Sequence, residues 1–386
     1  MCRRNSRNLL LSGLSLLCIL ASPALEAGVL PPDRADYLHH FYDGGGIEIN
    51  GPSLLVRKSI GENVSVTGSY YVDTISSASI DVVTTGASPD GYKEERKQWG
   101  GGVDYLHGDT TMSVGYSSSN ENDYEAKSLN FSISQDVFGG LTTISMGYGS
   151  GADKVSKRGD PVFSDTVDRS AYRLGLTQIL TRNLIVGFSY EAIADEGYLN
   201  NPYRRVRYVD ANEPQGYGLQ SEVYPRTHAS NAAAIRAKYH LAYDAALSAE
   251  YRFYTDDWGI EAHTLSVGYA QPFRTRWLFD LQYRFYTQTG ADFYSDLFPY
   301  ANYQNYLARD KELSTFQSQG PHLGVTYTFL DRQGDRPLKA TVNAFIDYYM
   351  FTYDDFRDLR VNTVVGDEPL YDFDAQIYQI FFSLWF

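Results

Sequence analysis

Hydrophobic and polar residues alternate along most of the chain, in segments of about ten residues. In one such segment Tyr172, Leu174 and Leu176 are apolar, and Arg173 and Gly175 stand between them. Because successive side chains of a β-strand point to opposite faces, each segment is predicted to be a strand with one apolar face. Strands of this length can cross a bilayer at a tilt.

Fifteen such segments can be placed from residue 47 to the end of the chain, joined alternately by short turns and by longer loops. Residues 151–168 are expected to form one of these loops, and residues 195–230 the longest. The pattern of turns places the C-terminus in the periplasm. With fifteen strands the first strand would then begin outside the cell, so one more strand is needed before it. Ala35 to Asp43 is the only unassigned stretch that can supply another strand, and a lead-in segment is the alternative.

The sequence therefore predicts an all-β fold: a transmembrane antiparallel up-and-down β-barrel of about 16 strands, an even number as in single-chain bacterial barrels. After residue 27 no apolar run reaches about 18 residues, so no transmembrane helices are expected. A secreted β-sandwich or propeller would also alternate, but it would have short loops on both sides.

The C-terminal segment alternates most regularly and ends on an aromatic residue. Its apolar face is formed by Tyr378, Ile380, Phe382, Leu384 and Phe386. This resembles the last strand of bacterial outer-membrane β-barrels, which the barrel-assembly machinery recognises. The resemblance implies the outer membrane of a Gram-negative bacterium, with lipid and lipopolysaccharide as surroundings. The alternative is a buried edge strand of a soluble sandwich.

Residues 1–27 have a basic start, an apolar run and a small-residue region, which predicts an export signal peptide. Residues 28–386 are then a single barrel domain. Cys2 and Cys18 both lie in the signal, so the mature chain can form no disulfide and no thiolate metal site. The net charge of −14 argues against a nucleic-acid-binding function.

Charged residues of both signs collect on the polar faces of the predicted strands. These candidate lumen-lining residues are Arg173, Glu191, Arg236, Lys238, Glu250, Arg252, Asp280, Arg284, Lys339 and Asp347. A barrel of this size keeps an aqueous interior unless something fills it. The residues could line a pore for small polar solutes, or they could pair across strands and close the inner wall.

The longest predicted loop begins with a segment rich in arginine and aromatic residues. Its candidate constriction residues are Tyr203, Arg204, Arg205 and Arg207. Such a segment could bind an anionic solute, pack on lipopolysaccharide phosphates or fold inward as a constriction. The alternative is an ordered loop held by its own Tyr and Arg contacts.

Four stretches carry a resemblance to a known family: residues 71–81, residues 87–96, residues 197–207 with the sequence Gly-Tyr-Leu-Asn-Asn-Pro-Tyr-Arg near their start, and residues 251–259 with Trp258-Gly259 at their end. Together they resemble an uncharacterised outer-membrane β-barrel family, domain-of-unknown-function family 3570. The resemblance implies one barrel over nearly the whole mature chain, and it hints at periplasmic redox and flavin-transfer functions nearby. It supplies no catalytic residues.

Enzymatic chemistry finds little support. His39-His40 has no partner at ligand spacing, and the remaining histidines are scattered. The acids of residues 354–372 could bind Ca²⁺ or Mg²⁺ bridging lipopolysaccharide, but a solvated acidic loop explains them better. We expect no enzyme, and no catalytic, cofactor or metal residues. The predicted function is a porin-like passive channel, with a closed barrel sheathing a periplasmic or redox partner as the alternative, and the sequence leaves a homo-oligomer open.

Overall fold

The computed structural model describes residues 29–76, 84, 93–334, 338–361 and 363–386. The predicted signal peptide, and parts of the family motifs at residues 71–81 and 87–96, lie outside the described residues. Among the residues described, no helix is long and apolar enough to span a membrane.

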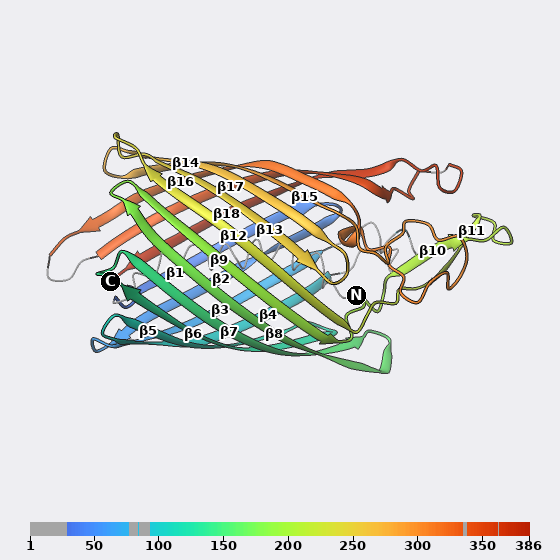
Figure 1. Cartoon of the computed structure of the whole chain (residues 1–386), viewed down its shortest axis with the longest axis horizontal. Helices are drawn as coiled ribbons and strands as arrows, with labels where there is room; N and C mark the ends of the chain where they lie inside the picture. The colour runs from blue at the N-terminus through green and yellow to red at the C-terminus, as the bar shows by residue number, and fades with distance from the viewer. Residues whose placement is uncertain (1–28, 77–83, 85–92, 335–337, 362) are drawn as a thin grey trace.

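Within the described part of the chain, sixteen antiparallel strands close into one barrel (Figure 1). The first eight are β1 (Arg34–Gly44), β2 (Ile47–Ile60), β3 (Val64–Ser76), β4 (Lys93–His107), β5 (Thr110–Asn120), β6 (Tyr124–Val137), β7 (Thr142–Lys157) and β8 (Asp160–Thr181). The others are β9 (Leu184–Gly197), β12 (Thr227–His240), β13 (Ala246–Asp256), β14 (Glu261–Phe273), β15 (Trp277–Gln288), β16 (Phe316–Arg332), β17 (Leu338–Arg357) and β18 (Leu370–Trp385). The predicted fold class is confirmed.

The strand that the turn pattern required at residues 35–43 is β1, and it closes the barrel. It pairs with β2 on one side and with β18 on the other, where Tyr37 lies opposite Phe382. Gly45 and Gly46 form its turn with φ angles of 61° and 79°, a conformation that residues with a side chain rarely adopt. The alternative of a lead-in segment is therefore wrong.

Large hydrophobic side chains cover the outside of the barrel. The predicted apolar face of the C-terminal segment is exposed from Tyr378 on β18 to Phe386. So are Tyr172, Leu174 and Leu176 on β8. A water-soluble barrel would bury such a continuous apolar surface, whereas a transmembrane barrel presents it to lipid.

The two ends of the barrel differ. At the end that holds the C-terminus, here called the turn end, short turns join the strands (Figure 1). At the opposite end, the loop end, the chain forms the β10–β11 hairpin (Arg205–Val209 and Tyr217–Ser221) and the 3₁₀ turn η1 (Lys311–Leu313). The longest predicted loop is confirmed here, between β9 and β12.

The prediction of a loop at residues 151–168 is wrong. β7 and β8 instead continue past the neighbouring strands, and only Arg158 and Gly159 separate them. Val155 and Val167 are buried at the base of this extension, in one apolar cluster with Leu199, Trp258 and Phe293. Polar residues in this stretch suggested a loop, but packing against other loops stabilises the paired strands.

Candidate functional site: the lumen wall and the loop cap

The predicted lumen charges lie on one side of the lumen wall, from β8 to β17. The ten candidate lumen-lining residues lie on β8, β9, β12, β13, β15 and β17, at positions that alternate with outward hydrophobics. Arg173, for example, stands between Tyr172 and Leu174, and Asp280 stands between Phe279 and Leu281.

Neighbouring strands pair most of these charges. Arg173 Nε lies 2.7 Å from Glu191 Oε1, and Arg252 Nη2 lies 4.0 Å from Glu191 Oε2. Arg236 on β12 forms an ion pair with Glu250 on β13. The wall thus holds a ladder of alternating charges that stays partly exposed: the Arg173 side chain is 54% exposed.

The rest of the charged side continues toward β17. His322 Nδ1 lies 2.8 Å from Asp347 Oδ1, and its Nε2 lies 3.9 Å from Asp280 Oδ1. Arg284 packs over the rings of Tyr286 and Tyr349, at 5.3 and 5.9 Å from their centroids. Two further members of the predicted set are Lys339, 5.4 Å above the Trp385 ring, and Lys238, near Asp280.

The other side of the lumen wall is lined by very small side chains. Across β4, β5 and β6 these are Gly100, Gly102, Ser113, Gly115, Ser117, Asn130 and Ser132. They border a cavity of about 330 Å³, flanked by the charged residues Arg57 and Asp104. Arg57 Nε donates to Thr67 Oγ1 at 3.0 Å, and Ser113 Oγ donates to Asp104 Oδ1 at 2.6 Å. We call this strip the small-residue groove.

At the loop end three segments assemble into a structure that we call the loop cap: residues 198–226, 289–315 and 358–369. Arg207 on β10 is wholly buried at its centre. Its Nε donates to Asp296 O at 2.9 Å, and its Nη atoms pair with the Asp296 and Glu368 carboxylates. One arginine therefore ties all three segments together.

Asp296 is shared with a second buried arginine. Arg309 Nη2 lies 2.8 Å from Asp296 Oδ1, and the same guanidinium packs 4.4 Å from the centroid of the Phe356 ring. Arg204 forms an ion pair with Asp310, next to η1. Two arginines of the predicted constriction are thus neutralised between loops, which matches an ordered loop better than a charged constriction.

In the part of the cap that the structure describes, the other two predicted constriction residues, Tyr203 and Arg205, form no ion pair with the buried carboxylates. Tyr203 links the cap to neighbouring hairpins, since its hydroxyl donates to Asp123 Oδ2 at 2.9 Å and accepts from the backbone N–H of Arg158 at 2.6 Å. Arg205 is exposed at the start of β10.

The ionisation of the cap follows from these contacts. Burial opposes the charge on Glu368, but hydrogen bonds from Arg207 and from backbone N–H groups, together with the charge of Arg207, hold the pKa of Glu368 below its usual value. Burial likewise acts to lower the pKa of Arg207, and the Glu368 and Asp296 carboxylates raise it instead. The Arg207–Glu368 pair is therefore charged at neutral pH.

The family motif at residues 251–259 forms a second anchor. Asp256 Oδ1 accepts the backbone N–H groups of Trp258 and Ile260 at 3.0 and 2.9 Å. Its Oδ2 lies 2.9 Å from both His228 Nε2 and the Tyr254 hydroxyl. The motif thus fixes the β13–β14 turn, and it places the Trp258 ring in the apolar cluster that includes Leu199 and Phe293 of the cap.

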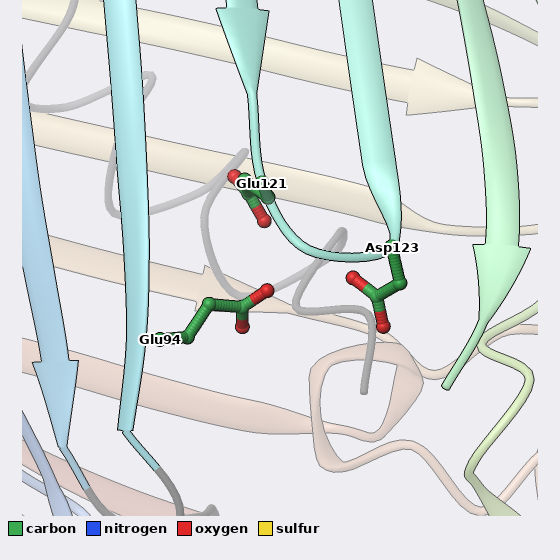
Figure 2. A group of neighbouring side chains, drawn as sticks. All are labelled: Glu94, Glu121 and Asp123. Atoms are coloured by element: carbon green, nitrogen blue, oxygen red, sulfur yellow. The ribbon is translucent and has the colours of Figure 1, made fainter. Parts of the chain in front are cut away.

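One group of carboxylates could hold a metal ion (Figure 2). Glu94 on β4, with Glu121 and Asp123 at the β5–β6 turn, offers oxygens that all lie within 4.8 Å of one another. Hard cations such as Ca²⁺ take oxygen ligands, usually six to eight of them. Arg96 Nε lies 3.8 Å from Glu121 and supplies part of the balancing charge. Glu94 and Asp123 are buried, but acidic groups also gather without an ion, and the expectation of no metal site stays a prediction.

The partners of the buried arginines could not be found from the sequence. Asp296 lies 89 residues from Arg207, and Glu368 lies 161 residues away. Only the run of acids in residues 354–372 drew attention to Glu368. The small-residue groove left a visible signal, which is small residues at alternate positions: Gly100 and Gly102, then Ser113, Gly115 and Ser117, then Ser128, Asn130 and Ser132.

A closed, even-stranded barrel with an apolar outer face is the architecture of bacterial outer-membrane β-barrel proteins. The chain belongs to the family described as "Protein of unknown function (DUF3570)", whose model matches residues 62–173 and 162–358. The family resemblance noted in the sequence is confirmed. A comparison with curated proteins gives no match.

Several solved structures are similar in shape at low sequence identity. The siderophore receptor PirA from Pseudomonas aeruginosa has 10% identity and a TM-score of 0.43, over 91% of this chain and 62% of the receptor. A bacterial polysaccharide outer membrane secretin has 8% identity and a TM-score of 0.49, over 93% of this chain and 98% of the secretin.

The loop L8 deletion mutant of OmpT, an outer membrane protein of Vibrio cholerae, has 10% identity and a TM-score of 0.42, over 92% of this chain and 99% of that one. The chain spans about three fifths of the length of PirA from P. aeruginosa and from Acinetobacter baumannii, 62% and 60% respectively.

Proposed function

We propose that the protein is a passive conduit for small polar solutes across the outer membrane of a Gram-negative bacterium. The observation that carries this proposal is the asymmetry of the lumen wall. The small-residue groove leaves a cavity of about 330 Å³ on one side, and a ladder of opposed charges faces the lumen from the other strands. A transverse field between such walls orders and sorts polar solutes.

The proposal assigns no catalytic step, cofactor or resident metal to the protein. Its partners are the passing solutes, the surrounding lipid and lipopolysaccharide, and the barrel-assembly machinery that recognises the segment ending at Phe386. The ladder of paired charges would have two roles. It would stiffen the neighbouring strands, and its partly exposed members would remain available to solutes.

The loop cap supports a second candidate. Three loop segments locked by buried ion pairs could close one end of the barrel, and the protein would then act as a sheath for a periplasmic or redox partner. A sheath needs no open path, so the two candidates differ in a measurable property.

The test is single-channel conductance of the folded protein in a planar bilayer, with a heat-modifiable gel shift to confirm folding. Discrete ohmic steps are the result expected of a conduit. A folded barrel that never conducts would overturn the conduit, and copurification of one periplasmic protein with the silent barrel would then support the sheath.

A further inference from the structure

An uncharged, tyrosine-rich segment lies exposed on the loop cap. Residues 299–306 read Pro-Tyr-Ala-Asn-Tyr-Gln-Asn-Tyr. The side chains of Tyr300, Tyr303 and Tyr306 are 58%, 47% and 45% exposed. We call these three residues the tyrosine surface. Neither function considered above makes use of them.

The segment is pinned at both ends. Phe298 and Leu307 flank it, and both are buried in a small apolar cluster with Val206. Phe298 N donates to Arg207 O at 2.9 Å, and Leu307 N donates to Val223 O at 2.7 Å. The tyrosine surface therefore lies on a base held by β10 and by Val223, which follows the β10–β11 hairpin.

The rings are also ordered among themselves. Tyr300 and Tyr303 form an edge-to-face pair with centroids 5.2 Å apart, and Phe293 lies 6.3 Å below Tyr306. Between them, Asn302 takes a positive φ of 55° and donates its backbone N–H to Gln220 Oε1 at 3.0 Å. Aromatic side chains that are already ordered lose little conformational entropy when a ligand binds.

The position of the segment separates it from the lipid-facing aromatics of the barrel. The loop between β15 and β16 (orange in Figure 1) runs beside β10, where Tyr208 and Phe298 form a parallel bridge. Figure 1 shows this hairpin projecting beyond the ends of the barrel strands. An interfacial girdle would lie on the strands themselves.

We propose that the tyrosine surface binds a neutral, hydroxyl-rich glycan outside the cell. The apolar C–H face of a sugar ring can stack on an exposed aromatic ring, while Asn302, Gln304 and Asn305 supply amide groups for its hydroxyls. This proposal does not depend on the conduit, because it concerns a surface outside the lumen.

Area and charge favour a glycan over a protein or a phosphate group. From the ~150–250 Å² that an aromatic side chain can bury, the three half-exposed rings offer roughly 300 Å². A stable protein interface buries about 800 Å² on each partner, which is well above that area. Recognition of phosphate or of an acidic sugar would use Arg or Lys, and residues 299–306 contain neither.

The experiment measures binding of the detergent-solubilised, folded protein to an array of immobilised neutral and acidic bacterial polysaccharides. The protein is expected to bind at least one neutral polysaccharide, with little dependence on salt. The triple variant Y300A/Y303A/Y306A should bind at least tenfold more weakly. Tyr303→Phe, which keeps the ring, should bind within about threefold of the unmodified protein, an effect near the size of one lost hydrogen bond.

Tyr243→Ala is the matched control, since this tyrosine is 60% exposed in a turn at the turn end and should not affect binding. A heat-modifiable gel shift checks that each variant has folded. The proposal is overturned if no neutral polysaccharide binds, if the triple variant binds as well as the unmodified protein, or if binding is confined to acidic polysaccharides and disappears with salt. Unchanged conductance of the triple variant would show that glycan binding and solute passage are independent properties of the protein.

Discussion

Arg207 and Glu368 form a two-pronged ion pair inside the loop cap, with Nη1 2.5 Å from Oε1 and Nη2 3.1 Å from Oε2. They are 161 residues apart in the chain. Asp296 completes the site from a third segment. Because all three side chains are buried, removal of one leaves a charge without compensation.

Arg207→Gln should loosen the cap and spare the barrel. Loss of one partner of a buried ion pair costs about 3 kcal/mol or more, here as local opening of the cap. Limited proteolysis should then cut within residues 205–221 much faster, while the heat-modifiable gel shift persists. Arg205→Gln is the control, because Arg205 is exposed and should tolerate the change. Equal cleavage of the two variants would contradict the assigned role of Arg207.

Acid should open the cap. The pKa of Glu368 lies below its ordinary value of 4.5, so its contribution to stability is complete above pH 4.5 and is lost as pH falls below that value. Hydrogen exchange of the β10–β11 amides, corrected for intrinsic rates, should rise over this range. Glu368→Gln should exchange faster at neutral pH and lose most of the acid response. An acid response that Glu368→Gln leaves intact would assign the effect to another group.

Charge reversal in the lumen should change ion selectivity if the barrel conducts. Arg236→Glu and Arg252→Glu replace cations that neighbour Glu250 and Glu191 on the wall. The reversal potential in a salt gradient should shift toward cation selectivity, because a net negative wall attracts cations. Arg205→Glu, outside the barrel strands, should leave it unchanged. The absence of any shift in the lumen variants would refute their assignment as pore-lining residues.

Filling the small-residue groove should reduce conductance. A Cβ at Gly115 would meet only Gly101 O, at 3.9 Å, so Gly115→Leu should be accommodated in β5 while its side chain enters the groove. Gly68→Leu is the matched control: it lies on β3 at an exposed position between Val66 and Tyr70, and nothing lies within 4 Å of its Cβ. A substantial drop is expected for Gly115→Leu alone. Equal conductance of the two variants would show that ions do not pass along the small-residue groove.

Removal of Phe386 should reduce assembly more than stability. The contacts of Phe386 are peripheral: Lys58 Nζ lies 5.0 Å from its ring centroid, and its backbone N–H donates to Asp33 O at 3.3 Å. The expected recognition by the assembly machinery predicts that the folded fraction in membranes falls severalfold, while protein folded in detergent retains its melting temperature within a few degrees. Phe273→Ala, at an exposed aromatic residue near the turn end, is the comparison. Equal folded fractions of the two variants in membranes would speak against a specific signal.

The alternation of side chains determined the barrel. A strand between two unlike environments must alternate, so the apolar faces from Tyr172 to Phe386 marked the strands directly. The parity of turns and loops then required β1 before any contact was known. This reasoning failed at residues 151–168, where polar composition indicated a loop and the pairing of β7 with β8 continued.

Only the tertiary structure decided the candidate sites. Alternation placed Arg173 and Glu191 on the same face of their strands, but it did not show their 2.7 Å contact. In the cap, the sequence contains Arg207, Asp296 and Glu368 without any periodic relation among them. Irregular loops have no repeating geometry, so long-range packing and the cost of burying charge select their partners, and these act only once the chain has folded.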